Sequence, residues 1–142
     1  MRHQVSVFTL ALFASLCACS LDYGYVQTLP ATLELSDADS VVFLVPSTVQ
    51  QDVPFDVSVR SYGGGCVTKG PFDVLTPFDT VAVLNPYEIV RSGSGVVCTQ
   101  ELRVFTHSAT LTFAQPGQVE VRVVGRDRAG VSMSRTKLVE VQ

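Results

Sequence analysis

The chain has 142 residues, a formal net charge of −3 and 16% charged residues. This length suits one domain with a substantial core, and the acidic balance lacks the basic footprint of a nucleic-acid-binding protein. We therefore expect a single domain and no nucleic-acid partner.

The first eighteen residues are typical of an export signal. Arg2 precedes a twelve-residue apolar run, 5–16, that carries no charge. The run falls within the roughly 7–15 residues of a signal-peptide core and is shorter than the ~20 residues of a membrane-spanning helix. A buried core helix fits less well, because the run is apolar all round. We predict a cleaved helical signal peptide over 1–18.

The end of this signal, Leu16-Cys-Ala-Cys19, resembles the lipobox of bacterial lipoproteins. Cys17 departs from the Ala or Ser that is common there, and acylation of Cys17 itself would leave the large Leu16 at the cleavage site. The resemblance implies diacylglyceryl and N-acyl chains on Cys19, since stable anchoring needs more than one chain. Because Ser20 follows instead of Asp, it also implies a lipid-anchored protein of the cell envelope, at the outer membrane and facing the periplasm.

Two cysteines remain for pairing after cleavage. Removing eighteen of the 142 residues leaves 124, and the loss of Arg2 brings the formal charge to −4. Cys66 and Cys98 form an even pair in an oxidising compartment, which predicts a disulfide. The alternatives are two free thiols or a metal pair, but a metal site needs more ligands than one mature histidine supplies. We expect no metal and no cofactor.

Beyond the cysteine, residues 19–30 are interpreted as the lipidated N-terminus and a short tether, and 31–142 as the folded domain. Alternating and short apolar runs predict strands over 32–36, 41–45, 53–60, 80–84, 102–106, 109–113, 119–123 and 137–141. Turn signals separate them at 63–65, Asn85-Pro86, 93–95, Pro116-Gly117 and Gly130. Pro116-Gly117 suits a type II turn, with proline fixing φ and glycine accepting a positive φ.

The last third of the chain resembles bacterial Ig-like or fibronectin III-like domains. Residues 109–124 look like the E strand, turn and F strand, and 125–141 is similar to the F–G hairpin. The chain departs from true Ig domains because it has no Trp, and because Cys66 and Cys98 lie outside the B and F positions. We predict an all-β fold, a single Ig-like β-sandwich of about 7–8 strands; the resemblance transfers no function.

Catalytic and metal-binding motifs are sparse. His107 is the only histidine of the mature chain, so a Ser-His-Asp triad would have to use it, at an expected strand end or turn. No G-x-S-x-G is present, and the S-x-x-K match at 134–137 lacks its partner motifs. Asp37 and Asp39 could hold Ca²⁺ in a loop, but a solvated turn over 36–40 is favoured. We predict no enzymatic activity.

Two features indicate binding surfaces. Five of the nine mature basic residues fall on the expected final hairpin: Arg122, Arg126, Arg128, Arg135 and Lys137. They predict either a patch for anionic groups or an ordinary solvated face. Between the cysteines, Pro-Phe-Asp occurs at 71–73 and again at 77–79. There Phe72, Phe78 and Tyr87 would either form a recognition surface on a stapled loop or plug the sandwich end.

We therefore expect a non-catalytic envelope lipoprotein that binds or assembles with a protein or glycan partner. The expected contact residues are Phe72, Phe78, Tyr87, Arg126 and Arg128. One alternative is a small-ligand or ion binder that delivers cargo to an envelope transporter, which needs a pocket of roughly 300 Å³ or more. The other is a small hydrolase that uses His107.

Overall fold

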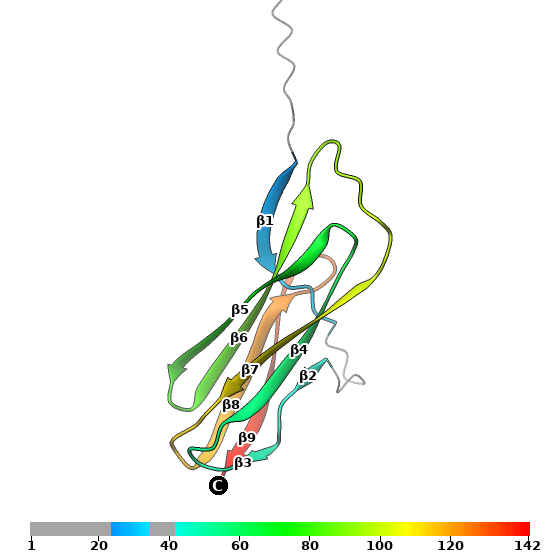
Figure 1. The fold of residues 1–142 in the computed structure, drawn as a ribbon. Helices are drawn as coiled ribbons and strands as arrows, with labels where there is room; N and C mark the ends of the chain where they lie inside the picture. The colour runs from blue at the N-terminus through cyan, green and yellow to red at the C-terminus, as the bar shows by residue number, and fades with distance from the viewer. Residues whose placement is uncertain (1–23, 35–41) are drawn as a thin grey trace, which may run out of the picture.

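The computed structural model describes residues 24–34 and 42–142, which form two β-sheets (Figure 1). The first sheet holds β1 (Tyr25–Pro30), β3 (Thr48–Val49), β5 (Val67–Phe78), β6 (Val81–Ser92), β8 (Gly117–Arg126) and β9 (Ser132–Val141). The second holds β2 (Phe43–Leu44), β4 (Phe55–Gly63) and β7 (Arg103–Leu111). The predicted all-β sandwich is confirmed. The signal, Cys19, and the Asp37 and Asp39 pair lie outside the described residues.

β6 is the central strand of the six-stranded sheet. One edge pairs with β5, and the other pairs with β8 over Val81–Leu84 and then with β1 over 87–92. β8 and β9 form the final hairpin that the sequence predicts, and β3 adds to β9. The β6–β8 pair is parallel, whereas the sheets of Ig-like sandwiches are antiparallel. In this feature the topology departs from the family that the last third resembles.

The core lies between the sheets and follows the period-two alternation of the sequence. Val57 and Val59 on β4 are buried, and so are the valines at alternate positions of β8. Because successive strand residues face opposite sides, each alternating run has one apolar face, which packs against the other sheet. The buried apolar side chains are Ala31, Leu33, Val42, Phe43, Val49, Val57, Val59, Ala82, Leu84, Leu111, Phe113, Val119, Val121, Val123, Val139 and Val141.

Two segments differ from the sequence prediction. Residues 25–30, assigned to the tether, form β1 and pair with β6, so within the described residues the folded domain already includes this segment. Asn85-Pro86, predicted as a turn, lies inside β6. A proline cannot donate a ladder hydrogen bond. Pro86 is tolerated because it sits where β6 changes partner from β8 to β1, opposite a bulge in β5.

The two glycine turns that flank β8 are confirmed. Gly117 has a φ of 114° and Gly130 a φ of 83°, in the region that favours glycine. In the second turn the Val131 amide donates to the Asp127 carboxylate at 2.8 Å, and the Gly130 amide donates to the Asp127 carbonyl at 3.0 Å. The second turn pairs β8 with β9, so that Val119 lies opposite Val139. Within the part of the chain that the structure describes, no helix is long and apolar enough to cross a membrane.

Candidate functional site

A cluster of polar side chains is buried between the two sheets. Ser61 on β4, Glu88 on β6 and His107 on β7 have no solvent-exposed surface. The sequence predicts His107 at a strand end or turn, and this prediction is wrong: it lies in the middle of β7, opposite Val59. Each of the three occupies an inward position where the alternation would place an apolar residue, which is why the pattern alone gives no sign of them.

Ser61 connects the other two members of the cluster. Its hydroxyl lies 3.1 Å from Nε2 of His107 and also hydrogen bonds to the Glu88 carboxylate. A carboxylate only accepts, so the single hydroxyl proton goes to Glu88 and Ser61 accepts from Nε2–H of His107. We assign the Nε2–H tautomer on this basis. It leaves His107 Nδ1 as an acceptor, and this atom has no hydrogen-bond partner among the described residues.

Burial raises the pKa of Glu88, and four contacts oppose that effect. They are a hydrogen bond from the Thr32 backbone, one from the Ser61 hydroxyl, the charge of Arg126 and a hydrogen bond from the Thr32 hydroxyl. The Arg126 guanidinium lies 3.8 Å and the Thr32 hydroxyl 3.4 Å from the Glu88 carboxylate. Arg126, which the sequence indicates as a possible partner contact, thus forms an ion pair with a buried carboxylate.

Burial, with a smaller effect of the nearby Lys69 charge, lowers the pKa of His107 to about 4. The imidazole is therefore neutral at pH 7, and the Phe72 ring packs against it with centroids 5.5 Å apart. In a hydrolytic triad the histidine stands between the nucleophile and the acid. Here the serine stands between the histidine and the acid, and neither Ser61 nor His107 reaches the surface.

The segment 67–97, interpreted as a stapled loop, is largely a hairpin of β5 and β6. The predicted disulfide is confirmed: Cys66 precedes β5, Cys98 follows β6, and their Cα atoms are 5.0 Å apart. It closes the hairpin at its open end. The disulfide restrains β5 and β6 at the open end of the hairpin, opposite the turn that joins the two strands.

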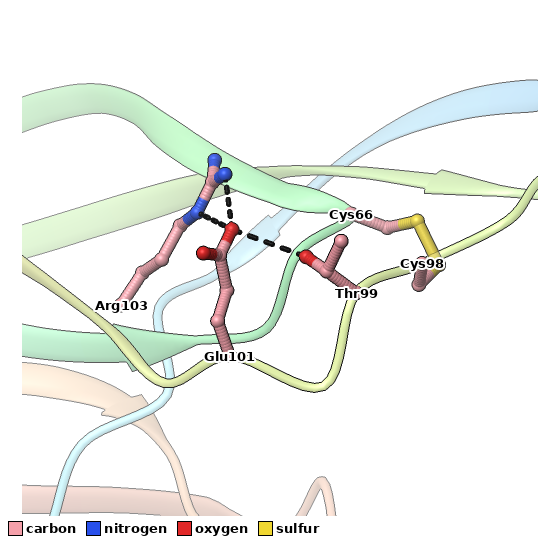
Figure 2. The surroundings of a disulfide bond; sticks show 5 residues. All are labelled: Cys66, Cys98, Thr99, Glu101 and Arg103. Atoms are coloured by element: carbon pink, nitrogen blue, oxygen red, sulfur yellow. Dashed lines mark hydrogen bonds and ion pairs between the residues drawn. A yellow bond between two sulfur atoms is a disulfide. The ribbon is translucent and has the colours of Figure 1, made fainter.

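The chain after Cys98 is held against the β4–β5 turn (Figure 2). Figure 2 shows the Glu101 carboxylate between Arg103 and Thr99, with Nε of Arg103 at 2.7 Å and the Thr99 hydroxyl at 3.1 Å. Both hydrogen bonds lower the pKa of Glu101, and the bond from Arg103 has the larger effect. A Cβ on Gly65 would lie 2.6 Å from the Thr99 amide nitrogen, so the close approach requires glycine there.

The three aromatic residues predicted as contacts have different environments. Phe72 is half-buried and packs on the core. Tyr87 is half-buried on β6, paired with Pro30. Phe78, at the hairpin tip, is 70% exposed, and the nearby Leu75 is also exposed. The structure therefore leaves Phe78 as the aromatic side chain available at this surface.

The five basic residues of the final hairpin do not form one patch. Arg122 pairs with Thr136 on the outer face, while Lys137 pairs with the inward Val121. The ammonium group of Lys137 donates to the Phe43 carbonyl at 2.6 Å. Ion pairs engage Arg122 with Glu120, Arg126 with Glu88 and Arg128 with Glu34. This distribution favours the solvated-face interpretation over a concentrated anion site.

An open groove of about 630 Å³ runs along the outer face of the three-stranded sheet. Its lining combines the aliphatic residues 44–46 at the end of β2 with outward polar residues of β4 and β7 and with two of their inward apolar residues: Leu44, Val45, Pro46, Asp56, Val57, Ser58, Ser108, Ala109 and Thr110. The Thr110 hydroxyl donates to the Asp56 carboxylate at 2.8 Å. In volume the groove exceeds the lower limit that a small-ligand binder requires.

No group of three or more His, Cys, Asp or Glu side chains that could hold a metal ion occurs in residues 24–34 and 42–142. Comparison of the chain with models of known families, with curated proteins and with solved structures found no match.

Proposed function

We propose that the chain is a lipid-anchored protein of the bacterial cell envelope, acylated at Cys19 and facing the periplasm. The lipobox-like Leu16-Cys-Ala-Cys19 supports this proposal. The Cys66–Cys98 disulfide supports it independently, because such bonds persist in oxidising compartments.

Metabolic labelling with an alkyne fatty acid tests the anchor. The full chain incorporates the label, Cys19→Ala abolishes it, and Cys17→Ala retains it. Label that persists in Cys19→Ala would contradict acylation at Cys19.

The domain acts as a non-catalytic binding or assembly module for a protein or glycan partner. The observation that carries this proposal is Phe78, 70% exposed at the tip of a hairpin whose base the disulfide closes. Aromatic side chains on rigid supports are preferred binding anchors, because little conformational entropy is lost when they are covered. The burial of Ser61 and His107 supports the non-catalytic part of the proposal.

Crosslinking and co-purification from envelope membranes test this module, with an array of envelope glycans as the second readout. The acylated protein captures a stoichiometric partner, and Phe78→Ser reduces capture at least tenfold. Leu138→Ser, another exposed apolar residue but on β9, is the matched control and leaves capture unchanged. Equal capture by both variants would rule out the hairpin tip as the contact.

The groove of about 630 Å³ favours a second candidate function, the binding of a small ligand that is passed to an envelope transporter. Its floor of hydroxyl and carboxylate groups would accept a polar molecule. Native mass spectrometry of protein released gently from membranes tests this candidate. A retained small molecule that Ser108→Phe displaces would support it, and a bare protein mass would count against it.

A further inference from the structure

The β1 end of the sandwich is defined here by Tyr25, Val26, Arg91, Val96 and Val97. Figure 1 shows the start of β1 beside the loop that follows β6, at the opposite end from the C-terminus. The Arg91 amide donates to the Cys66 carbonyl at 3.0 Å, and Val96 lies against Gly24. The disulfide and the β1–β6 pairing therefore hold this end together.

Apolar side chains surround the β1 end. Val97 is 92% exposed, Val26 60% and Tyr25 51%. Tyr25 and Val26 are successive strand residues, so they project from opposite faces of the sheet, while Val97 lies on the loop. A protein partner that docks on a flat face would cover only one of these sides. The distribution suits insertion of the whole end into an apolar medium.

The segments that carry the exposed apolar side chains of the β1 end contain no acidic residue, and the Glu101 carboxylate beyond Cys98 is paired with Arg103. The three segments that meet there, 24–31, 63–68 and 89–98, contain no Asp or Glu. Their one charged side chain is Arg91, whose guanidinium has no partner among the described residues. Five acidic residues lie toward the other end, near the start of β4, the β5–β6 turn, the start of β8 and the end of β9: Asp52, Asp56, Asp79, Glu120 and Glu140. Carboxylates are costly to remove from water and are repelled by anionic lipid, so these three segments can approach a bilayer at a lower cost than the acidic end of the sandwich.

The chain before Gly24 ties this end to the proposed acylation site. Cys19 stands five residues earlier in the sequence, and five residues reach at most about 18 Å. The β1 end therefore stays within that distance of the lipid attached to Cys19. The intervening segment contains one carboxylate, Asp22, whose formal charge is opposite to that of Arg91.

We propose that the β1 end inserts Tyr25, Val26 and Val97 into the membrane–water interface of the bilayer that holds the Cys19 lipid. This inference rests on the proposed lipid anchor and adds a fixed orientation. The tip of the β5–β6 hairpin, with Phe78, then points away from the membrane. Tyrosine at the headgroup level and aliphatic side chains just below it are the arrangement that bilayer interfaces favour.

Single tryptophan reporters test the orientation, because the chain has no tryptophan of its own. Full-length acylated Val97→Trp and Phe78→Trp are reconstituted into phosphatidylethanolamine and phosphatidylglycerol vesicles that contain brominated phosphatidylcholine as quencher. Val97→Trp is quenched, and Phe78→Trp, an exposed reporter at the far tip, is not. Adding Val26→Asp to Val97→Trp reduces the quenching severalfold, which excludes insertion by the tryptophan alone.

Each outcome decides the proposal. If Val97→Trp is not quenched in protein whose mass proves acylation of Cys19, the proposed insertion is overturned and the anchor is left intact. Equal quenching at 97 and 78 would overturn the orientation. A mass that shows no acyl chain on Cys19 of the full-length protein purified from envelope membranes would overturn the proposed anchor and, with it, this inference.

Discussion

The interior of the sandwich changes character along its length. On β4 the inward positions run from Val57 to Ser61, and on β6 from Leu84 to Glu88. The same two strands therefore supply an apolar half and, toward the disulfide, a polar half that His107 completes. The two halves are equally buried, so burial alone does not make them alike in energy.

The two halves differ in how burial affects the stability of the fold. Apolar burial stabilises by about 25 cal/mol per Å², whereas a buried polar group must be hydrogen-bonded to avoid a net cost. The polar half is only partly satisfied, because Glu88 Oε1, His107 Nδ1 and Arg126 Nε have no hydrogen-bond partner among the described residues. The disulfide lies beside this half, and because it restricts the unfolded chain its contribution does not depend on how well the neighbouring interior packs.

The largest expected effect is in the apolar half. Leu84 is fully buried, and Leu84→Ala should lower the free energy of unfolding by about 2–5 kcal/mol because it leaves a cavity. Urea denaturation measures the loss. The exposed Leu75→Ala on the neighbouring strand should change stability by less than about 0.5 kcal/mol. Similar losses for both variants would contradict the assignment of Leu84 to the core.

The disulfide should have the next largest effect. Replacing Cys66 and Cys98 together by Ser should destabilise the domain by roughly 3.5–4 kcal/mol in the chain-entropy model. Hydrogen exchange should show the loss of protection concentrated at the ends of β4, β5 and β6. Protection lost evenly over both halves would argue against the disulfide as a local support of the polar half.

Acid should destabilise the polar half through His107. Its folded pKa of about 4 lies below the ordinary 6.5, so its contribution is complete above pH 6.5 and is lost as pH falls toward 4, on the order of 3 kcal/mol. Glu88 acts in the opposite sense: its raised pKa means that stability is complete below 4.5 and is lost as pH rises through the folded value.

Unfolding free energies measured from pH 7 to 4 test the two slopes. His107→Gln should remove the acid-side loss, and Glu88→Gln should make the loss steeper, since the opposing gain on protonation disappears. Identical pH profiles for the wild type and His107→Gln would show that His107 titrates normally in the folded protein.

The smallest effect is expected for the link between the two titrating groups. Ser61→Ala removes a hydrogen-bond partner of both His107 and Glu88 and should cost about 1–3 kcal/mol. Replacing Ser61, Glu88 and His107 together by Ala, Leu and Leu should be neutral or stabilising, because the three partly satisfied polar side chains give way to apolar ones and the partly exposed Arg126 can turn to water. A triple variant less stable than Ser61→Ala would show that the cluster stabilises the fold on balance.

Several elements were predictable because their cause is local. The alternation of 119–123 predicts the inward valines of β8, and Pro116-Gly117 predicts the turn before them. The Cys66–Cys98 pair was predictable by elimination. The β5–β6 hairpin was missed because Pro71, Pro77 and Pro86 read as loop signals, and a proline in a strand is acceptable only where its neighbours leave no ladder bond to make.

The amino-acid sequence by itself determined the all-β class, the disulfide pair and most strand positions, because side-chain alternation and turn chemistry act over a few residues. Only the tertiary structure decided that Ser61, Glu88 and His107 meet, that the cations of the final hairpin are dispersed, and that Phe78 is exposed while Phe72 is packed. Those properties depend on which strands become neighbours. That choice is made by contacts between residues far apart in the chain, which a local pattern does not encode.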